Sequence, residues 1–314
     1  MKQTRAREQA MVPRAEPRTY YDRPVLKKPV WKWYIPAYFF TGGMAGASAT
    51  LSFAARLRGN DRLARRASLI SLAGIAASPV FLIADLGRPD RFYNMLRVAK
   101  PTSPMSMGTW LISLFGPATG AAALSDVTGV LPGAGRLAEA VAAVLGPGVS
   151  TYTAVLTADT AIPAWHEAWR ELPIVFAGGS AASAGAAAVL VTPAADAAPA
   201  RRLVALGTSM ELAAERAMVQ RLGDLAEPYR SGQASSPVKA AKGLLRAGAL
   251  LVSLGSHRRP WLARTGAVAT LAGVALTRWS IFKAGFESAE DPRFTVQPQR
   301  ERLSRERASA SEPM

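Results

Sequence analysis

Residues 79–94 read PVFLIADLGRPDRFYN, and this stretch indicates the solvent in which the chain folds. The apolar run reaches Ile83, meets the carboxylate of Asp85, and breaks at Gly87 and Pro89. Gly and Pro at the end of an apolar periodic segment are helix stop signals. An acid at this point is typical of a helix that leaves an apolar environment for water, and the composition tells which environment that is.

The composition favours a lipid bilayer. Of the 314 residues, 49% are hydrophobic and 19% are charged, whereas a soluble domain carries about 25% charged residues. The net charge of +16 is spread over stretches between long apolar segments. This distribution is typical of membrane topology and not of a nucleic-acid-binding surface.

The chain contains no Cys and two His, His166 and His257. The lack of Cys excludes disulfides, iron–sulfur ligation and thiolate metal sites within this sequence. Neither His lies in the middle of an apolar segment, so we expect no haem between spans and no metal site. Any redox role must therefore use electrons from a partner subunit.

The apolar segments predict an all-α, polytopic membrane protein with eight transmembrane helices in two four-helix bundles. Each segment is close to the roughly 20 residues that cross a hydrocarbon core. The predicted spans are 34–55, 67–86, 107–125, 139–160, 173–192, 202–221, 238–255 and 262–283. Residues 1–33 are predicted to be a basic mobile tail, 34–283 the membrane domain, and 284–314 a charged tail. The sixth and seventh spans contain charged residues, so an interfacial hairpin is the alternative for that pair.

The loops set the predicted orientation. Lys and Arg are more numerous in the tails and in the loops on the N-terminal side than in the loops on the other side. The positive-inside rule then places both termini in the cytoplasm of a multi-pass cell-membrane protein. The loop 56–66, RLRGNDRLARR, goes against this orientation.

Charged residues of the spans are predicted to gather in the cytoplasmic half of the membrane. Asp85 and Asp159 end the second and fourth spans, and Glu211 and Glu215 lie four residues apart on one face of the sixth. Charges within a bilayer are disfavoured by roughly 2.5–3.5 kcal/mol each on insertion scales, which favours a functional role. The alternatives are that the two Asp are interfacial, and that Arg246 is the structural ion-pair partner of Glu211 or Glu215.

The loop after the fourth span, IPAWHEAWRELP, combines Trp, His and Glu at the same predicted level. Trp165 and Trp169 could form an ordinary interfacial aromatic belt. An imidazole beside carboxylates could also relay protons, which makes His166 next to Glu167 a candidate for direct function.

Three stretches resemble one known family: YFFTGGMAGASATL at 38–51, DLGRPDRFYNML at 85–96 followed by PTSPMSMGTWLIS at 101–113, and DTAIPAWHEAWRELP at 159–173. They resemble the NrfD / polysulfide-reductase membrane-subunit (PsrC-like) family. The resemblance is concentrated in residues 31–180.

The resemblance implies a haem-free membrane anchor that exchanges electrons with a quinone, either menaquinone or ubiquinone. It also implies a ferredoxin-like [4Fe–4S] partner subunit and a molybdopterin catalytic subunit. On this basis Tyr38, Asp85 and His166 are expected at the quinone head, with Asp85, Asp159 and His166 as catalytic proton carriers. Glu211, Glu215 and Arg246 would form a proton path or a structural ion pair. The residues expected to dock the partner are Arg88, Arg91, Trp165 and Glu167.

Two other readings stay open from the sequence. In a transporter, the charges within the spans would line a substrate path, but the chain shows no inverted pair of broken spans. In a passive anchor, the chain would tether a soluble oxidoreductase without binding quinone.

Overall fold

The computed structural model describes residues 25–231, 234–255 and 259–310, and every regular element in these ranges is helical. Most of the predicted basic tail, and His257, lie outside the described residues. The all-α fold class is therefore confirmed for the part of the chain that the structure describes.

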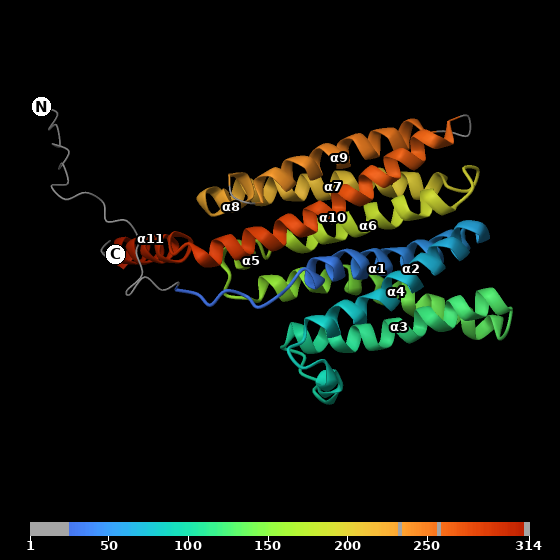
Figure 1. The fold of residues 1–314 in the computed structure, drawn as a ribbon, viewed down its shortest axis with the longest axis horizontal. Helices are drawn as coiled ribbons and strands as arrows, with labels where there is room; N and C mark the ends of the chain where they lie inside the picture. The colour runs from blue at the N-terminus through green and yellow to red at the C-terminus, as the bar shows by residue number, and fades with distance from the viewer. Residues whose placement is uncertain (1–24, 232–233, 256–258, 311–314) are drawn as a thin grey trace, which may run out of the picture.

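In the described part of the chain, eight long helices form the body (Figure 1). They are α1 (Tyr34–Leu57), α2 (Asp61–Asp85), α3 (Pro104–Thr128), α4 (Pro132–Ala158), α6 (Leu172–Val191), α7 (Ala198–Leu222), α9 (Ser235–Leu254) and α10 (Pro260–Glu290). Each overlaps one predicted span. The shorter elements are the 3-10 helices η2 (Pro89–Arg97) and η3 (Gly223–Ala226) and the α-helices α5 (Pro163–His166) and α8 (Glu227–Arg230). The chain continues into α11 (Arg293–Ala310), so helix extends into the segment predicted to be a charged tail.

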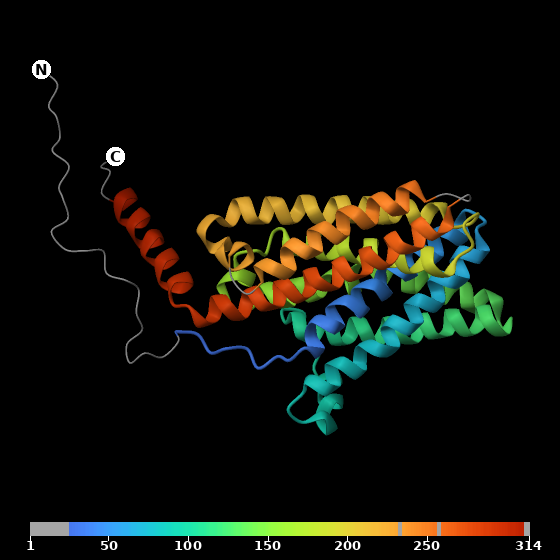
Figure 2. The ribbon, with the colours of Figure 1, turned by 45° about the horizontal axis from the view of Figure 1, so that its top comes forward.

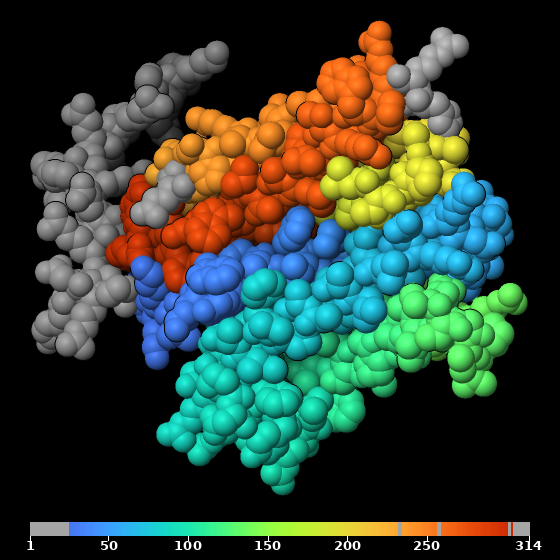
Figure 3. Space-filling view, turned by 45° about the vertical axis from the view of Figure 1, so that its right-hand side comes forward, coloured from blue at the N-terminus to red at the C-terminus, as the bar shows by residue number. Residues whose placement is uncertain are grey.

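The long helices pack in two groups of four. Helices α1 to α4 contact one another and form the first bundle, whereas α6, α7, α9 and α10 form the second bundle. The groups lie side by side, joined mainly by α1 against α6 and α10 and by α4 against α6 (Figure 3). Within the described ranges, four helices, α2, α3, α4 and α6, are by length and composition apolar enough to cross a membrane. The protein is therefore a multi-pass membrane protein.

Close helix contacts depend on glycine. An ideal Cβ on Gly46 of α1 would lie 2.3 Å from the carbonyl oxygen of Gly146 on α4, and a Cβ on Gly146 would lie 2.4 Å from the Gly46 oxygen. Gly178 of α6 and Gly207 of α7 face each other in the same reciprocal way. Small residues allow such backbone approach in lipid, where burial of apolar surface does not drive helices together.

Successive long helices run in opposite directions, so their termini gather at two ends of the body (Figures 1 and 2). We name these the α5 end and the hairpin end. The α5 end holds the start of α1, the end of α2, η2, α5 and α8. The hairpin end holds the turn between α1 and α2, where Asn60 caps α2 by accepting a hydrogen bond from the Leu63 amide at 3.1 Å. Helix α11 leaves the bundle axis at the α5 end (Figure 2).

Candidate functional site

A cavity of about 130 Å³ opens into the first bundle at the α5 end. Its walls are almost entirely apolar and come from α1, α2, α3, α4 and η2. The lining residues are Trp31, Ile35, Tyr38, Phe39, Leu82, Asp85, Leu86, Met95, Met105, Thr109, Ile112, Tyr152 and Leu156. A cavity of about 150 Å³ in a protein interior can bind a benzene-sized ring. The space therefore suits one ring whose substituents leave through the opening.

Two polar side chains that line this cavity, Tyr38 and Asp85, differ in their burial. Tyr38 is 1% exposed, and its hydroxyl has no hydrogen-bond partner among the described residues. Asp85 is half-buried at the end of α2, and one of its oxygens accepts a hydrogen bond from the backbone amide of Lys32 at 2.8 Å. Buried hydroxyls normally find a partner, so the orphaned Tyr38 group marks a place where a ligand acceptor fits.

Local sequence explains how these groups meet. The apolar run of α2 ends at Asp85 because Leu86 is extended, with ψ of 136°, and Pro89 opens η2. The 3-10 helix then returns the chain, so that Met95 reaches the cavity wall. Ser103 caps α3 by accepting from the Ser106 amide at 3.4 Å. The structure thus brings together Tyr38 and Asp85, two of the three residues predicted at the quinone head.

His166 is the third, and the prediction that it contacts the ring is not supported by its position. It lies exposed in α5, outside the cavity lining, and its Nδ1 is 3.0 Å from the carbonyl oxygen of Ala158. A carbonyl oxygen only accepts, so Nδ1 carries the proton in this contact. Asp159 caps the end of α4, is also exposed and does not line the cavity.

Trp165 was predicted as a docking residue but is part of the protein core. Its side chain is 0% exposed, and its indole nitrogen donates to the Ile281 carbonyl of α10 at 2.7 Å. It stacks on Trp31 with ring centroids 5.4 Å apart, and a Cβ on Gly285 would lie within 1.8 Å of its ring. The prediction failed because Trp165 and Trp169 share the same interfacial sequence signal, whereas only Trp169 is exposed.

The remaining docking candidates do lie at the surface of the α5 end. Arg88 and Arg91 are exposed around η2, and Glu167 is half-buried. Nearby, Arg221 donates two hydrogen bonds of 2.6 Å, one to each carboxylate oxygen of Glu171. This hydrogen bonding to Arg221 lowers the pKa of Glu171 below its ordinary value.

The second bundle buries an acid and a base that face each other. Glu211 of α7 and Arg278 of α10 are both 0% exposed. An ideal Cβ on Gly179 would lie 2.6 Å from Arg278 Nη2 and 3.0 Å from a Glu211 oxygen. The lack of a side chain at Gly179 therefore leaves space for both of these groups. Arg278 also donates to the Phe176 carbonyl at 2.8 Å and lies over the Phe176 ring, 4.0 Å from its centroid.

Arg246 was predicted to pair with Glu211 or Glu215, and the structure gives both acids other partners. Glu215 forms an ion pair with Lys242 at 3.1 Å, and Glu211 faces Arg278. Arg246 lies one helical turn beyond Lys242, exposed on α9. The prediction considered Arg246 alone, although α9 also carries Lys239 and Lys242, and the rotation of the helix turns Lys242 toward Glu215.

The sequence model described as "Polysulphide reductase, NrfD" matches residues 24–206, more than half of the chain. The chain belongs to the NrfD family. The match covers the cavity of the first bundle and ends within α7, before Glu211. Among curated proteins, none matches this sequence.

This NrfD-family chain carries a further ion cluster that sequence reasoning missed. At the hairpin end, Arg56 of α1 forms ion pairs with Asp126 of α3 and Glu139 of α4, and lies 3.7 Å from Asp61. Ser52 donates to the second Glu139 oxygen at 2.5 Å. The charged residues of the spans were predicted to gather in one half of the membrane. The Arg56 cluster lies at the opposite end, so this prediction is wrong. Arg56 and Glu139 both lie at span ends on the same side, and this was the signal that could have found the pair.

Three or more His, Cys, Asp or Glu side chains in a metal-binding arrangement do not occur within the described ranges of this NrfD-family protein.

Proposed function

We propose that this chain is the quinone-reactive membrane subunit of a multi-subunit oxidoreductase. Electrons would pass between an iron–sulfur partner and the membrane quinone pool. The observation that carries the proposal is the apolar, ring-sized cavity at the α5 end, which holds an unpartnered buried hydroxyl and a carboxylate at its mouth. Membership of the NrfD family supports it.

Each polar group has a role that follows from its position. A quinone takes up or releases two electrons, and its two carbonyl oxygens exchange protons. Tyr38 is the buried donor that orients one of these oxygens, because no other group in the described structure accepts its proton. Asp85 moves protons between the cavity and water, since it is half-buried at the cavity mouth. The Lys32 amide holds the Asp85 carboxylate in place.

The electrons would come from outside the chain, because no Cys is available to hold a cluster. We propose a ferredoxin-like [4Fe–4S] subunit as the direct partner and a molybdopterin subunit beyond it. Docking is assigned to the α5 end, which places the partner over the cavity. There η2 exposes Arg88 and Arg91 beside Phe92 and Tyr93, which are 42% and 53% exposed. Exposed aromatic and Arg side chains are enriched at protein interfaces.

We also propose that all eight long helices cross the membrane, with both termini in the cytoplasm. Burial of Glu211 and pairing of Glu215 with Lys242 support a spanning α7, because these acids do not face lipid. Single cysteines can test this in the natural Cys-free sequence. Labelling with an impermeant thiol reagent would compare Asp224→Cys with Ala99→Cys at the α5 end and Ala195→Cys at the hairpin end.

If α7 and α9 span the membrane, Asp224→Cys labels from the same side as Ala99→Cys. If they form an interfacial hairpin, it labels with Ala195→Cys, and the eight-span proposal is wrong. The side itself tests the orientation: cytoplasmic termini require Ala99→Cys to be protected in intact cells.

The quinone site is tested by quinone-linked electron transfer in membranes that contain the assembled complex. Asp85→Asn and Tyr38→Phe are compared with Asp90→Asn and Tyr34→Phe, which make the same chemical changes at positions that do not line the cavity and are not among the proposed docking residues. Co-purification of the partner subunits checks assembly. Loss of quinone turnover in the first pair alone supports the proposal.

Normal turnover in all four variants would instead favour a passive anchor without a quinone site. That reading remains the second candidate, because an apolar cavity beside the docking surface could also be filled by lipid.

A further inference from the structure

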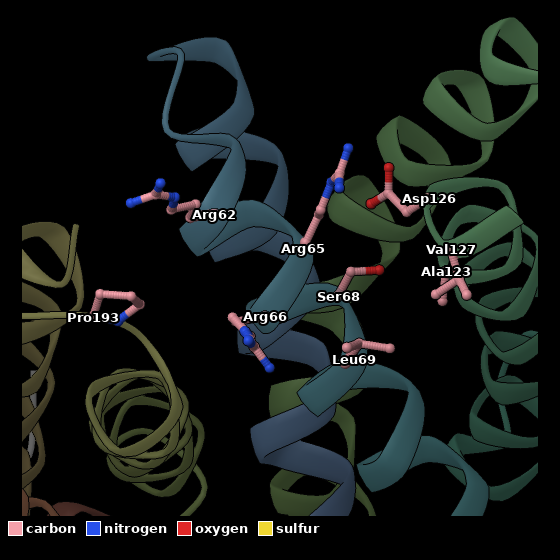
Figure 4. Close-up of a pocket in the computed structure, with 9 residues that line it drawn as sticks. All are labelled: Arg62, Arg65, Arg66, Ser68, Leu69, Ala123, Asp126, Val127 and Pro193. Atoms are coloured by element: carbon pink, nitrogen blue, oxygen red, sulfur yellow. The ribbon is translucent and has the colours of Figure 1, made fainter. Parts of the chain in front are cut away.

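A second and larger cavity, of about 410 Å³, lies at the hairpin end between α2, α3 and the loop after α6 (Figure 4). The α2 wall is basic, and the α3 wall is apolar apart from Asp126. Its lining residues are Arg62, Arg65, Arg66, Ser68, Leu69, Ala123, Asp126, Val127 and Pro193. This is the loop region whose positive charge goes against the predicted orientation.

Two of the three arginines have no ionic partner among the described residues. Arg62 lies 3.4 Å from Asp196, whereas Arg65 and Arg66 make no ion pair within the part of the chain that the structure describes. The acid of the cavity, Asp126, is already bound by Arg56. Two exposed guanidinium groups are thus free to bind an anion, and their planar forks match the oxygens of a phosphate.

The depth of the cavity points to a lipid. The arginines occupy the first two turns of α2, directly before the apolar stretch that begins at Ala67, and Asp126 lies in the last turn of α3. Both helices are candidate membrane spans, so the basic wall lies at the level of the headgroups. One turn further along α2, Leu69 is 41% exposed, and Val127 of α3, at the level of Asp126, is 71% exposed. The two side chains offer an apolar surface for the upper part of an acyl chain.

We propose that this cavity binds an anionic phospholipid, with Arg65 and Arg66 on the headgroup phosphate and the acyl chain along Leu69 and Val127. A free phosphate would satisfy the arginines but would leave the apolar wall without a function, so the structure favours the lipid. The site is separate from the proposed quinone cavity, which lies at the other end of the bundle.

Native mass spectrometry of the full chain tests the proposal. The protein would be released from nanodiscs that contain phosphatidylglycerol or phosphatidylcholine. We expect the natural chain to retain phosphatidylglycerol. In Arg65→Gln/Arg66→Gln its affinity for phosphatidylglycerol should fall by about tenfold or more, because losing even one charge-assisted hydrogen bond has about this effect. Arg58→Gln/Arg136→Gln is the matched control, because both residues are exposed at the same end and do not line the cavity.

Several results would overturn the proposal. Equal loss in the two double variants would mean non-specific attraction to charge, and equal retention of both lipids would mean no headgroup recognition. Displacement of the lipid by inorganic phosphate at equal affinity would mean a soluble-anion site. If Arg65→Gln/Arg66→Gln does not fold, Arg65→Lys/Arg66→Lys keeps the charge and loses the fork. It must then bind phosphatidylglycerol more weakly than the natural chain.

Discussion

Removing one member of the buried pair Glu211 and Arg278 should destabilise the second bundle strongly. The two side chains are 0% exposed, and both Glu211 oxygens lack a hydrogen-bond partner among the described residues. Arg278 has the Phe176 carbonyl and ring as further partners. The charge of Glu211 therefore depends on the attraction of Arg278 more than the reverse.

The magnitude follows from the burial of both charges. Glu211 and Arg278 form no ion pair within 4.0 Å, so their attraction stays below the roughly 4 kcal/mol of two unit charges about 4 Å apart at an effective dielectric constant of about 20. Breaking a buried pair by removing one partner costs about 3–5 kcal/mol in the free energy of unfolding. We expect Arg278→Met to lose about this amount and Glu211→Gln to lose less, because Arg278 keeps its contacts with Phe176.

The double variant is the decisive member of the series. Its destabilisation should fall short of the sum of the single effects by up to about 3 kcal/mol, the upper range for energetically coupled residues. Unfolding in detergent micelles by denaturant titration measures all three, with Arg264→Met as a control on the exposed face of α10. The control should change stability by about 0.5 kcal/mol at most. Additive effects of the two substitutions would refute the pairing.

Two further predictions concern packing and pH. Gly46→Ala should destabilise the contact of α1 with α4 by about 1–3 kcal/mol, because its Cβ would meet the Gly146 carbonyl at 2.3 Å. Gly243→Ala, which has open space around the new Cβ, should be neutral or stabilising, and equal melting temperatures of the two variants would contradict the packing. Glu171→Gln should lower stability by about 1 kcal/mol, in full only above the ordinary pKa of about 4.5. Because Arg221 lowers the folded-state pKa, the contribution is complete above the unfolded value and disappears as the pH falls through the folded value, so thermal melts between pH 3 and 7 should converge at the acidic end.

The sequence predicted the helices well because their apolar segments are long and their stop signals are strong. Gly87 and Pro89 end α2 close to the expected residue, and Asp85 lies at a helix end as expected. The loop 223–234 was harder, since its polar composition gave no sign of α8. The C-terminal segment was predicted as a tail because it is rich in charged residues, yet Arg293–Ala310 forms α11.

The candidate site was predicted in part. Tyr38 and Asp85 line the same cavity because Tyr38 lies near the start of α1 and Asp85 at the end of α2. The two helices are antiparallel, so these ends lie on the same side. Tyr152 was missed, since an aromatic residue inside an apolar span has no distinguishing signal. Burial of Trp165 and the choice of Lys242 over Arg246 depend on helix rotation and on contacts with α10, and neither can be read from spacing along the chain.

Photoaffinity labelling by an azidoquinone tests the central claim most directly. The reagent would be applied to the purified chain, and the modified peptides would be identified by mass spectrometry. We predict labels on the segments that line the α5-end cavity, around Tyr38 on α1 and Met105 on α3, with strong reduction in the Tyr38→Phe and Asp85→Asn variants and by competing natural quinone. Labels found only on the second bundle, or unchanged in these variants, would contradict the assignment of the quinone site.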